Sequence, residues 1–472
     1  MSAPPLDDVR QPKVADRWSV VPLLRRLHFY AGVFVAPFLI VAAATGLLYS
    51  LAPQIDSVLY GDVLTVPAAT GTPRPLAEQV TAAQAALPEG SVTSVSVAED
   101  PDLATRVVFA APGLPEDYSK AVFVDPYTAR VQGQLTTWAG ATPAVTWLDQ
   151  LHRDLHLGET GALYSEMAAS WLWVIALGGV VLWLARQRTA RRRVRSVVLP
   201  EGGAKGVRRT RSWHASLGVW TLVGALFLSA TGLTWSTYAG ENFAAALTAL
   251  NAKAPSLDTA LSGGASPAPS EHAGHGGSGQ ATAVDPATFD RVLTSARTAG
   301  LDGPLDITVA AAPGSAWTAA QADNTWPIRL DKIALDPATA TITARADWSD
   351  RPFLAKLSSL GIQAHMGVLF GLANQIALLL LAAAILTLAV LGYRMWWQRR
   401  PTRADRRTSF GTPPTRGAWR QLPLWAIVPA PLLLIAVCWA LPVLGVSLLA
   451  FLVVDLLVGL RRDRTTQPAT RR

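Results

Sequence analysis

The chain has 472 residues, of which 50% are hydrophobic and only 16% charged, and its formal net charge is +8. This composition indicates an integral membrane protein. The one cysteine, Cys438, excludes an intrachain disulfide, a cysteine-ligated iron–sulfur cluster and a c-type haem attached through Cys-x-x-Cys-His.

Uncharged apolar segments predict the membrane helices. Each of four segments is long enough to cross a hydrocarbon core of about 30 Å, which takes about 20 residues: 29–50, 167–185, 213–240 and 357–393. A further stretch, 422–460, is interrupted only by Asp455 and is long enough for two crossings with a turn near Leu441 and Pro442. The sequence therefore predicts a six-helix membrane protein with a four-helix core and a C-terminal hairpin. Asp455 is expected either near the interface or in a proton relay.

Basic and acidic residues lie in different segments of the chain. Together, 28 basic and 6 acidic residues occupy segments 1–26, 186–211, 394–420 and 461–472. By contrast, segments 51–165 and 237–364 hold 13 basic and 25 acidic residues. Because cationic loops stay cytoplasmic, both termini are predicted inside and the two large segments outside. The net charge is thus a topology signal, and no nucleic-acid partner is predicted.

The two large segments contain related patterns. Residues 120–131 match residues 332–342, and each copy predicts two strands joined by an Asp-Pro turn, with proline at the position that a type I turn prefers. Amphipathic helices are predicted before them, and strands between each helix and its turn: 75–87, 91–98 and 106–110, then 286–299, 305–311 and 316–322. Each segment is predicted to form a small extracytoplasmic α+β domain, near the lower size limit for an independent core.

The resulting organisation alternates membrane helices with external domains. A Gly-, Ser-, Ala- and Pro-rich stretch, 254–284, predicts a flexible linker. The predicted segments are an N-terminal cytoplasmic segment (1–26), a first helix (27–52), a first external domain (53–143), a histidine motif with the second helix (144–186), a basic loop (187–211), a third helix (212–240), the linker region (241–284), a second external domain (285–352), a histidine motif with the fourth helix (353–397), a basic loop (398–420), the hairpin (421–460) and a basic tail (461–472).

Four histidines occupy matching places in two copies of one pattern. His28 and His214 each begin a membrane helix, and in both copies a Thr-Gly pair follows at the same distance along the chain. His156 and His365 each stand in a His-x-Gly motif before the next membrane helix. Ionisable residues at membrane depth are costly and rare, so four in register indicate ligation of a metal or cofactor.

With both motifs duplicated, residues 20–400 resemble the PepSY-associated transmembrane family, whose members carry histidines at the helix ends and two outer domains with the Asp-Pro-x-Thr hairpin. Characterised relatives include siderophore-linked ferric reductases of the bacterial inner membrane that bind two b-type haems. The resemblance therefore implies a multi-pass protein of the bacterial cytoplasmic membrane with two haem b groups.

The chemistry of the residues agrees with that implication. A b-type haem needs one or two axial imidazoles and an apolar slot between helices. Pairing histidines on the same membrane side gives a cytoplasmic site at His28 and His214 and an outer site at His156 and His365. His152, one turn before His156, is an alternative axial ligand, a substrate contact or a plain surface histidine.

Small and basic residues near the cytoplasmic pair are further candidates. Gly32 and Gly218, one turn after their histidines, are expected to leave room for a porphyrin edge. Three arginines either meet haem propionates or only obey the positive-inside rule: Arg25, Arg26 and Arg211. In the linker, His272 and His275 fall short of a metal-ligand set, so a solvated linker is the preferred interpretation.

The first functional hypothesis is haem-dependent electron transfer to ferric iron or a ferric siderophore outside. No dinucleotide fingerprint follows a predicted strand, so the electron donor is expected to be a cytoplasmic reductase or a membrane quinol. The alternatives are a non-enzymatic envelope protein whose outer domains bind peptides or regulate a partner protease, and a metal or siderophore uptake component.

Overall fold

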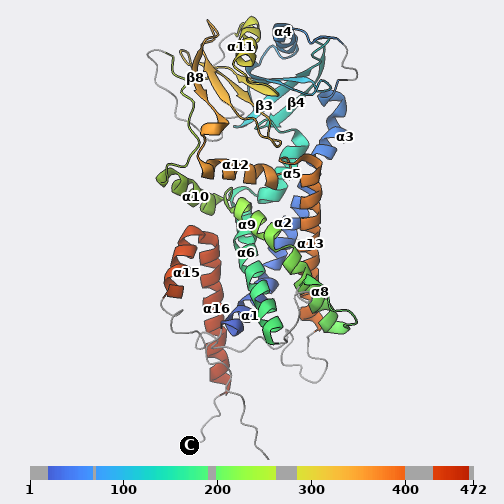
Figure 1. The fold of residues 1–472 in the computed structure, drawn as a ribbon, viewed down its shortest axis with the longest axis vertical. Coiled ribbons are helices and arrows are strands. Elements are labelled where there is room, and N and C mark those ends of the chain that lie inside the picture. The colour runs from blue at the N-terminus through green and yellow to red at the C-terminus, as the bar shows by residue number, and fades with distance from the viewer. Residues whose placement is uncertain (1–19, 67–70, 190–197, 262–283, 399–428, 467–472) are drawn as a thin grey trace, which may run out of the picture. The chain divides into compact units, whose positions relative to one another are not determined.

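The computed structural model describes residues 20–66, 71–189, 198–261, 284–398 and 429–466 (Figure 1). The chain divides into two compact units. The first, here called the helical unit, consists of Met1–Val41, Leu163–Asn242 and Ala384–Arg472. The second, here called the sheet unit, consists of Ala42–Ala162 and Phe243–Ala383. The two pattern copies predicted from the sequence each contribute segments to both units.

Long apolar helices support a membrane protein with an additional domain. Two helices are long and apolar enough to cross a membrane by themselves: α6 (Gly158–Thr189) and α13 (Gly371–Gln398). Two bent pairs pass the same test when each pair is taken together: α1 (Val21–Phe34) with α2 (Ala36–Tyr49), and α8 (Gly206–Trp220) with α9 (Leu222–Leu233). These elements correspond to the first four predicted helices.

The C-terminal hairpin is described over residues 429–466. It consists of α15 (Pro429–Ala440) and α16 (Pro442–Thr466), which meet at Leu441 where the turn was expected. Their apolar parts, Pro431–Ala440 and Pro442–Leu457, are shorter than a membrane span. Within the described residues, up to four crossings meet the test of length and composition, and the two further crossings predicted for the hairpin are not confirmed.

The two bends stand at equivalent positions. The α1/α2 pair is bent by 57° at Val35, seven residues after His28, and the α8/α9 pair by 59° at Thr221, seven residues after His214. Pro37 lacks the N–H that would continue the first helix. The Thr221 hydroxyl donates to the Leu217 carbonyl at 2.9 Å, a contact that bends helices. Different residues thus produce the same bend.

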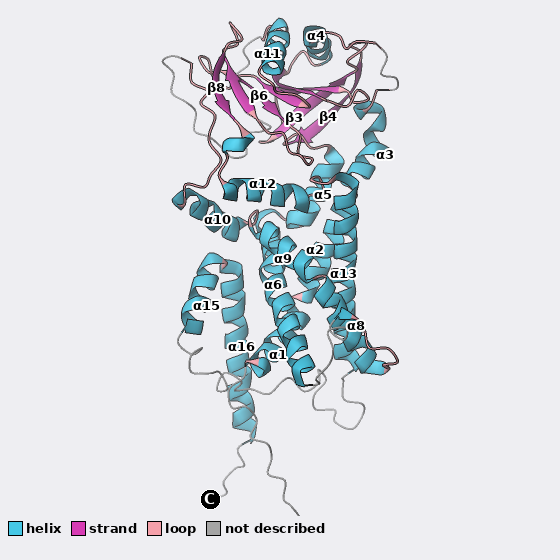
Figure 2. Cartoon of the chain, viewed as in Figure 1, coloured by secondary structure: helices cyan, strands magenta, loops and turns pink. Residues whose placement is uncertain are grey.

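The sheet unit contains one antiparallel sheet of eight strands in the order β4-β3-β2-β1-β5-β6-β7-β8 (Figure 2). The first repeat contributes β1 (Ser91–Val97), β2 (Thr105–Ala110), β3 (Tyr118–Val124) and β4 (Val131–Trp138). The second contributes β5 (Leu305–Thr308), β6 (Trp317–Gln321), β7 (Lys332–Leu335) and β8 (Ile342–Ala346). The repeats are therefore two halves of one sheet and not the two separate domains that the sequence predicted.

Backbone pairing and a common core explain why the repeats join. Strand β1 pairs with β5, from Ser94 opposite Thr308 to Val97 opposite Leu305. Helices α4 (Leu76–Ala86) and α11 (Ala287–Thr298) cover the same face of the sheet (Figure 2). Beneath them, fully buried residues of both repeats form one cluster that includes Val80, Val95, Phe109, Phe289, Ile307 and Leu335. Sharing this core removes the size problem that each repeat would face alone.

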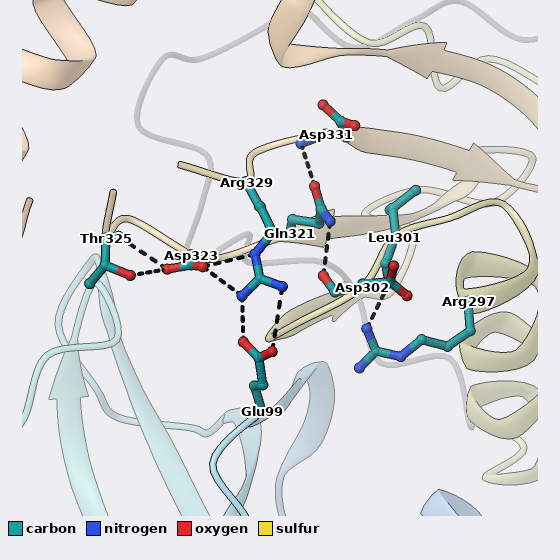
Figure 3. Close-up of polar contacts among 9 residues, drawn as sticks. All are labelled: Glu99, Arg297, Leu301, Asp302, Gln321, Asp323, Thr325, Arg329 and Asp331. Carbon is teal, nitrogen blue, oxygen red and sulfur yellow. Dashed lines mark hydrogen bonds and ion pairs between the residues drawn. The ribbon is translucent and has the colours of Figure 1, made fainter. Parts of the chain in front are cut away.

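Polar contacts also connect the two repeats. The Asp290 carboxylate of α11 accepts from the first backbone N–H groups of α4, at 2.7 Å from Leu76 N and 3.0 Å from Ala77 N. It satisfies donors that the helix itself leaves unpaired. Figure 3 shows Arg329 of the second repeat between Asp323 and Glu99. Because Glu99 follows β1, this ion pair joins the repeats beside their shared strands.

The predicted Asp-Pro hairpins are present in both repeats. The Asp125 carboxylate accepts from Tyr127 N at 2.8 Å, and that of Asp336 accepts from Ala338 N at 2.9 Å. Each turn ends in an alanine with a left-handed backbone, since φ is 56° at both Ala129 and Ala340. The matching backbone confirms the repeat that was inferred from the sequence.

Shorter helices lie between these elements: α3 (Ala52–Leu64), α5 (Pro143–Asp154), α10 (Thr237–Ala249), η1 (Trp348–Asp350) and α12 (Phe353–His365). On the second face of the sheet, Val63 and Leu64 of α3 pack against Phe123. The linker histidines His272 and His275 lie outside the described residues, as do most of the basic loops.

Candidate functional site

His28 of α1 and His214 of α8 lie face to edge in the helical unit. Their ring centroids are 6.4 Å apart, and the ring planes are inclined by 79°. Both side chains are half-buried. We call them the α1/α8 pair, and the structure brings together the two residues that the sequence predicted to share a site.

Each ring of the α1/α8 pair is held through its Nδ1 atom. His28 Nδ1 lies 3.1 Å from the Ile175 carbonyl oxygen of α6, and His214 Nδ1 lies 3.1 Å from the Leu388 carbonyl oxygen of α13. A carbonyl only accepts hydrogen bonds, so Nδ1 must be the donor in both rings. In the neutral rings this assigns the lone pair to Nε2, as in histidines that bind a metal and anchor their other nitrogen on the backbone.

Glycines make room for these rings. A Cβ atom on Gly179 of α6 would lie 3.0 Å from His28 Cε1, and one on Gly392 of α13 would lie 3.8 Å from His214 Cε1. Each glycine stands four residues after the residue whose carbonyl anchors the same ring. The carbonyl and the glycine therefore lie on one face of their helix. The two supports are thus built in the same way on α6 and α13.

A second pair lies in the sheet unit. The ring centroids of His152, on α5, and His365, at the end of α12, are also 6.4 Å apart, with planes inclined by 47°. We call this the α5/α12 pair. His152 Nδ1 lies 2.9 Å from the Thr45 hydroxyl, which itself donates to the Ala42 carbonyl. Since that hydroxyl has one hydrogen, Nδ1 donates to it and Nε2 carries the lone pair.

The surroundings of the α5/α12 pair keep both imidazoles neutral. Burial lowers the pKa of His152 to about 4, against the opposing effect of a hydrogen bond to the Ala42 carbonyl. Burial, reinforced by the charge of His152, lowers the pKa of His365 to about 4. Both rings are therefore unprotonated near pH 7 and have a lone pair for a metal ion. Gly46 makes room for His152, because a Cβ atom there would lie 3.1 Å from His152 Cε1.

Over residues 25–399, the sequence matches the family described as the PepSY-associated TM region. The chain belongs to this family. No curated protein matches it. The matched region includes all five candidate histidines and ends before the α15–α16 hairpin.

Of the two histidines that the sequence left as alternatives, the structure places His152, and not His156, beside His365. Helix α5 ends at Asp154, and Leu155 and His156 both have a left-handed φ of 57°, which turns the chain away from the face that carries His152. His156 is exposed, and its ring packs 5.1 Å from that of Trp147.

The sequence contains a signal for His152 that the local His-x-Gly motif obscures. The spacing along the chain from His152 to Gly179 equals the spacing from His365 to Gly392. His156 stands about one helical turn too close to Gly179 to match. Aligning the two pattern copies on the glycines of the membrane helices would have selected His152. The two anchoring carbonyls give no such signal, because a backbone carbonyl does not depend on the type of residue that carries it.

The ring separation in both pairs is close to that expected for two imidazoles on one metal ion. Two imidazole nitrogens that bind one metal ion each lie about 2 Å from it, which puts the ring centroids about 6 Å apart. Within the described residues, no group of three or more His, Cys, Asp or Glu is arranged to hold a metal. Two neutral imidazoles alone are a donor set that suits haem, whose porphyrin supplies the other four nitrogens.

The residues next to the α1/α8 pair determine whether there is room for a porphyrin beside the two imidazoles. A Cβ atom on Gly32 would meet no heavy atom within 4 Å, and one on Gly218 would meet only Leu388 Cδ2 at 3.9 Å. The expected room beside both glycines is present. Arg26, in contrast, is buried and forms an ion pair with Asp455 of α16.

Proposed function

We propose that this protein binds two b-type haems and transfers electrons across the bacterial cytoplasmic membrane. The two matching imidazole pairs carry the proposal. Both have the same ring separation of 6.4 Å, and each contains a ring that is held through Nδ1, which leaves the lone pair on Nε2. One such pair would be a weak argument, but two built from repeated sequence elements support a common cofactor.

The histidines have distinct roles in this proposal. His28 and His214 ligate the haem iron nearer the cytoplasm, and His152 and His365 ligate the one nearer the outer face. This assignment follows from the positive-inside rule, with both termini cytoplasmic. The carbonyls of Ile175 and Leu388 and the Thr45 hydroxyl orient the rings. Bound haem b supplies reversible one-electron redox chemistry.

The proposed electron acceptor is ferric iron or a ferric siderophore outside the membrane. Ferric iron is the preferred class of acceptor because the family that the chain resembles includes haem-containing ferric reductases. The proposed donor is a cytoplasmic reductase or a membrane quinol, because the chain has no dinucleotide fingerprint of its own. The surrounding bilayer is the remaining partner.

Haem quantification tests the proposal. The purified protein is expected to show b-type bands on reduction and two haems per chain, because each imidazole pair holds one. His214→Ala and His365→Ala are each expected to leave one haem. His156→Ala is the matched control, since this exposed histidine stands outside both pairs, and it should retain two. A folded but colourless wild-type protein would refute the proposal and favour a non-enzymatic envelope role.

A further inference from the structure

The α15–α16 hairpin lies beyond the family match and packs against the helical unit. Its Asp455 forms an ion pair with Arg26 of α1, whose side chain is only 8% exposed. The Arg26 guanidinium also lies 5.5 Å from the centre of the Tyr30 ring, which in turn packs against Phe451 of α16. A buried cation in a membrane helix is costly unless a carboxylate neutralises it, so this pair fixes α16 against α1.

Further contacts fix the hairpin against α6 and α10. Trp171 Nε1 of α6 donates to the Ser447 hydroxyl of α16 at 2.8 Å. Asn242 Nδ2 of α10 donates to the Trp439 carbonyl at 3.1 Å, near the end of α15. Leu444 of α16 is buried in a cluster with Ala31, Val35 and Trp171. The hairpin therefore packs against both α1 and α6.

These two helices are the ones that position His28. Ala31 and Val35 follow His28 on α1 by three and seven residues, which places them along one side of the helix. On α6, Trp171 stands four residues before Ile175 and eight before Gly179. The backbone carbonyl of Ile175 anchors the His28 ring. Contact with Leu444 thus couples the hairpin to the place where α1 and α6 hold that imidazole.

We propose that the α15–α16 hairpin is a positioning element for the α1/α8 pair and that Asp455 is the residue on which its docking depends. Asp455 does not touch the histidines. Arg26 and His28 point in directions about 160° apart around α1, so Asp455 acts by fixing the position of the helix. This inference rests on the proposed function in one respect, which is that the α1/α8 pair holds haem.

The first test compares neutralising variants in two single-haem backgrounds. In the His365→Ala background, which keeps only the α1/α8 haem, Asp455→Asn and Arg26→Gln are each expected to speed haem transfer to apomyoglobin by about 10- to 100-fold, the usual effect of an outer-shell change. The double variant leaves no unpaired buried charge and should transfer haem more slowly than either single variant.

The His214→Ala background supplies the control. It keeps only the α5/α12 haem, and Asp455→Asn is expected to leave its transfer rate unchanged. Val454→Ala changes the neighbouring residue, which is 59% exposed, and should have no effect in either background. Equal acceleration in both backgrounds, or acceleration in neither, would overturn the proposal.

The second test does not depend on haem. Cys438 is the only cysteine of the chain, it is half-buried in α15, and it follows Val437 of the packed cluster. In the full-length protein in detergent, Asp455→Asn is expected to raise its rate of alkylation by a maleimide, and Val454→Ala is not. An unchanged rate in Asp455→Asn would overturn the docking role even if haem is bound. If the wild-type protein binds no haem but Asp455→Asn still raises the alkylation rate of Cys438, the docking role is supported and the proposed haem function is refuted.

Discussion

Each ring of the α1/α8 pair is held between a carbonyl and a glycine, and the fit is tightest at His28. A Cβ atom on Gly179 would lie 3.0 Å from the His28 ring, whereas one on the adjacent Gly178 would lie at an ordinary 3.9 Å. Since protein interiors are close-packed, the first contact requires the ring or the helix to move. The two neighbouring glycines therefore differ sharply in what they tolerate.

This difference predicts that Gly179→Ala lowers the haem content from two per chain towards one, because the displaced His28 ring no longer aligns with His214. Gly178→Ala is the matched control and should keep both haems. Haem per chain, measured as the pyridine haemochrome, gives the answer. Equal haem content in the two variants would show that Gly179 does not position the ring.

The Thr45 hydroxyl has a comparable role at His152. Thr45→Val keeps the shape of the side chain but removes the acceptor for His152 Nδ1–H. It is expected to weaken haem binding at the α5/α12 pair by about 10- to 100-fold. Competition with apomyoglobin in the His214→Ala background measures this affinity. Thr45→Ser retains the hydroxyl and should bind like the parent, and a Thr45→Ser variant as weak as Thr45→Val would contradict the account.

Most secondary-structure elements could be predicted from the sequence, because their side-chain periodicity is strong. The helix predicted at 75–87 is α4, and the strand predicted at 91–98 is β1. The choice between His152 and His156 stayed open, because the left-handed turn at Leu155 and His156 has no signature in those residues. The bend at Thr221 was not predicted, because no proline marks the break.

The joining of the repeats was also beyond the sequence argument. A strand with buried residues on one face specifies its register but does not say which strand lies next to it. The pairing of β1 with β5 connects residues 94 and 308, and only the complete sheet shows it. The two external domains predicted from the sequence are therefore halves of one sheet.

Among the described residues, the internal duplication runs from α1 to α13, and the two repeats complete each other. Each repeat supplies one histidine to the α1/α8 pair and one to the α5/α12 pair, and each supplies half of the sheet. A single repeat would therefore lack a complete imidazole pair, and its β1 or β5 strand would have no neighbour on one side. Both units depend on the duplication.

The shared core predicts that the two halves of the sheet unfold together. Ile307 is fully buried in β5, opposite Val95 of β1, so Ile307→Ala is expected to destabilise the sheet unit by about 2–5 kcal/mol. Hydrogen exchange in denaturant should show the same loss of protection in β2 and β6. Loss of protection in β6 alone would mean that the repeats are independent.

The position of iron tests the central claim most directly. An anomalous difference map of the haem-loaded protein, recorded at the iron absorption edge, is predicted to show two peaks per chain, one between His28 and His214 and one between His152 and His365. An iron peak at His156 would contradict this account, and so would a map without a peak between the two histidines of each pair.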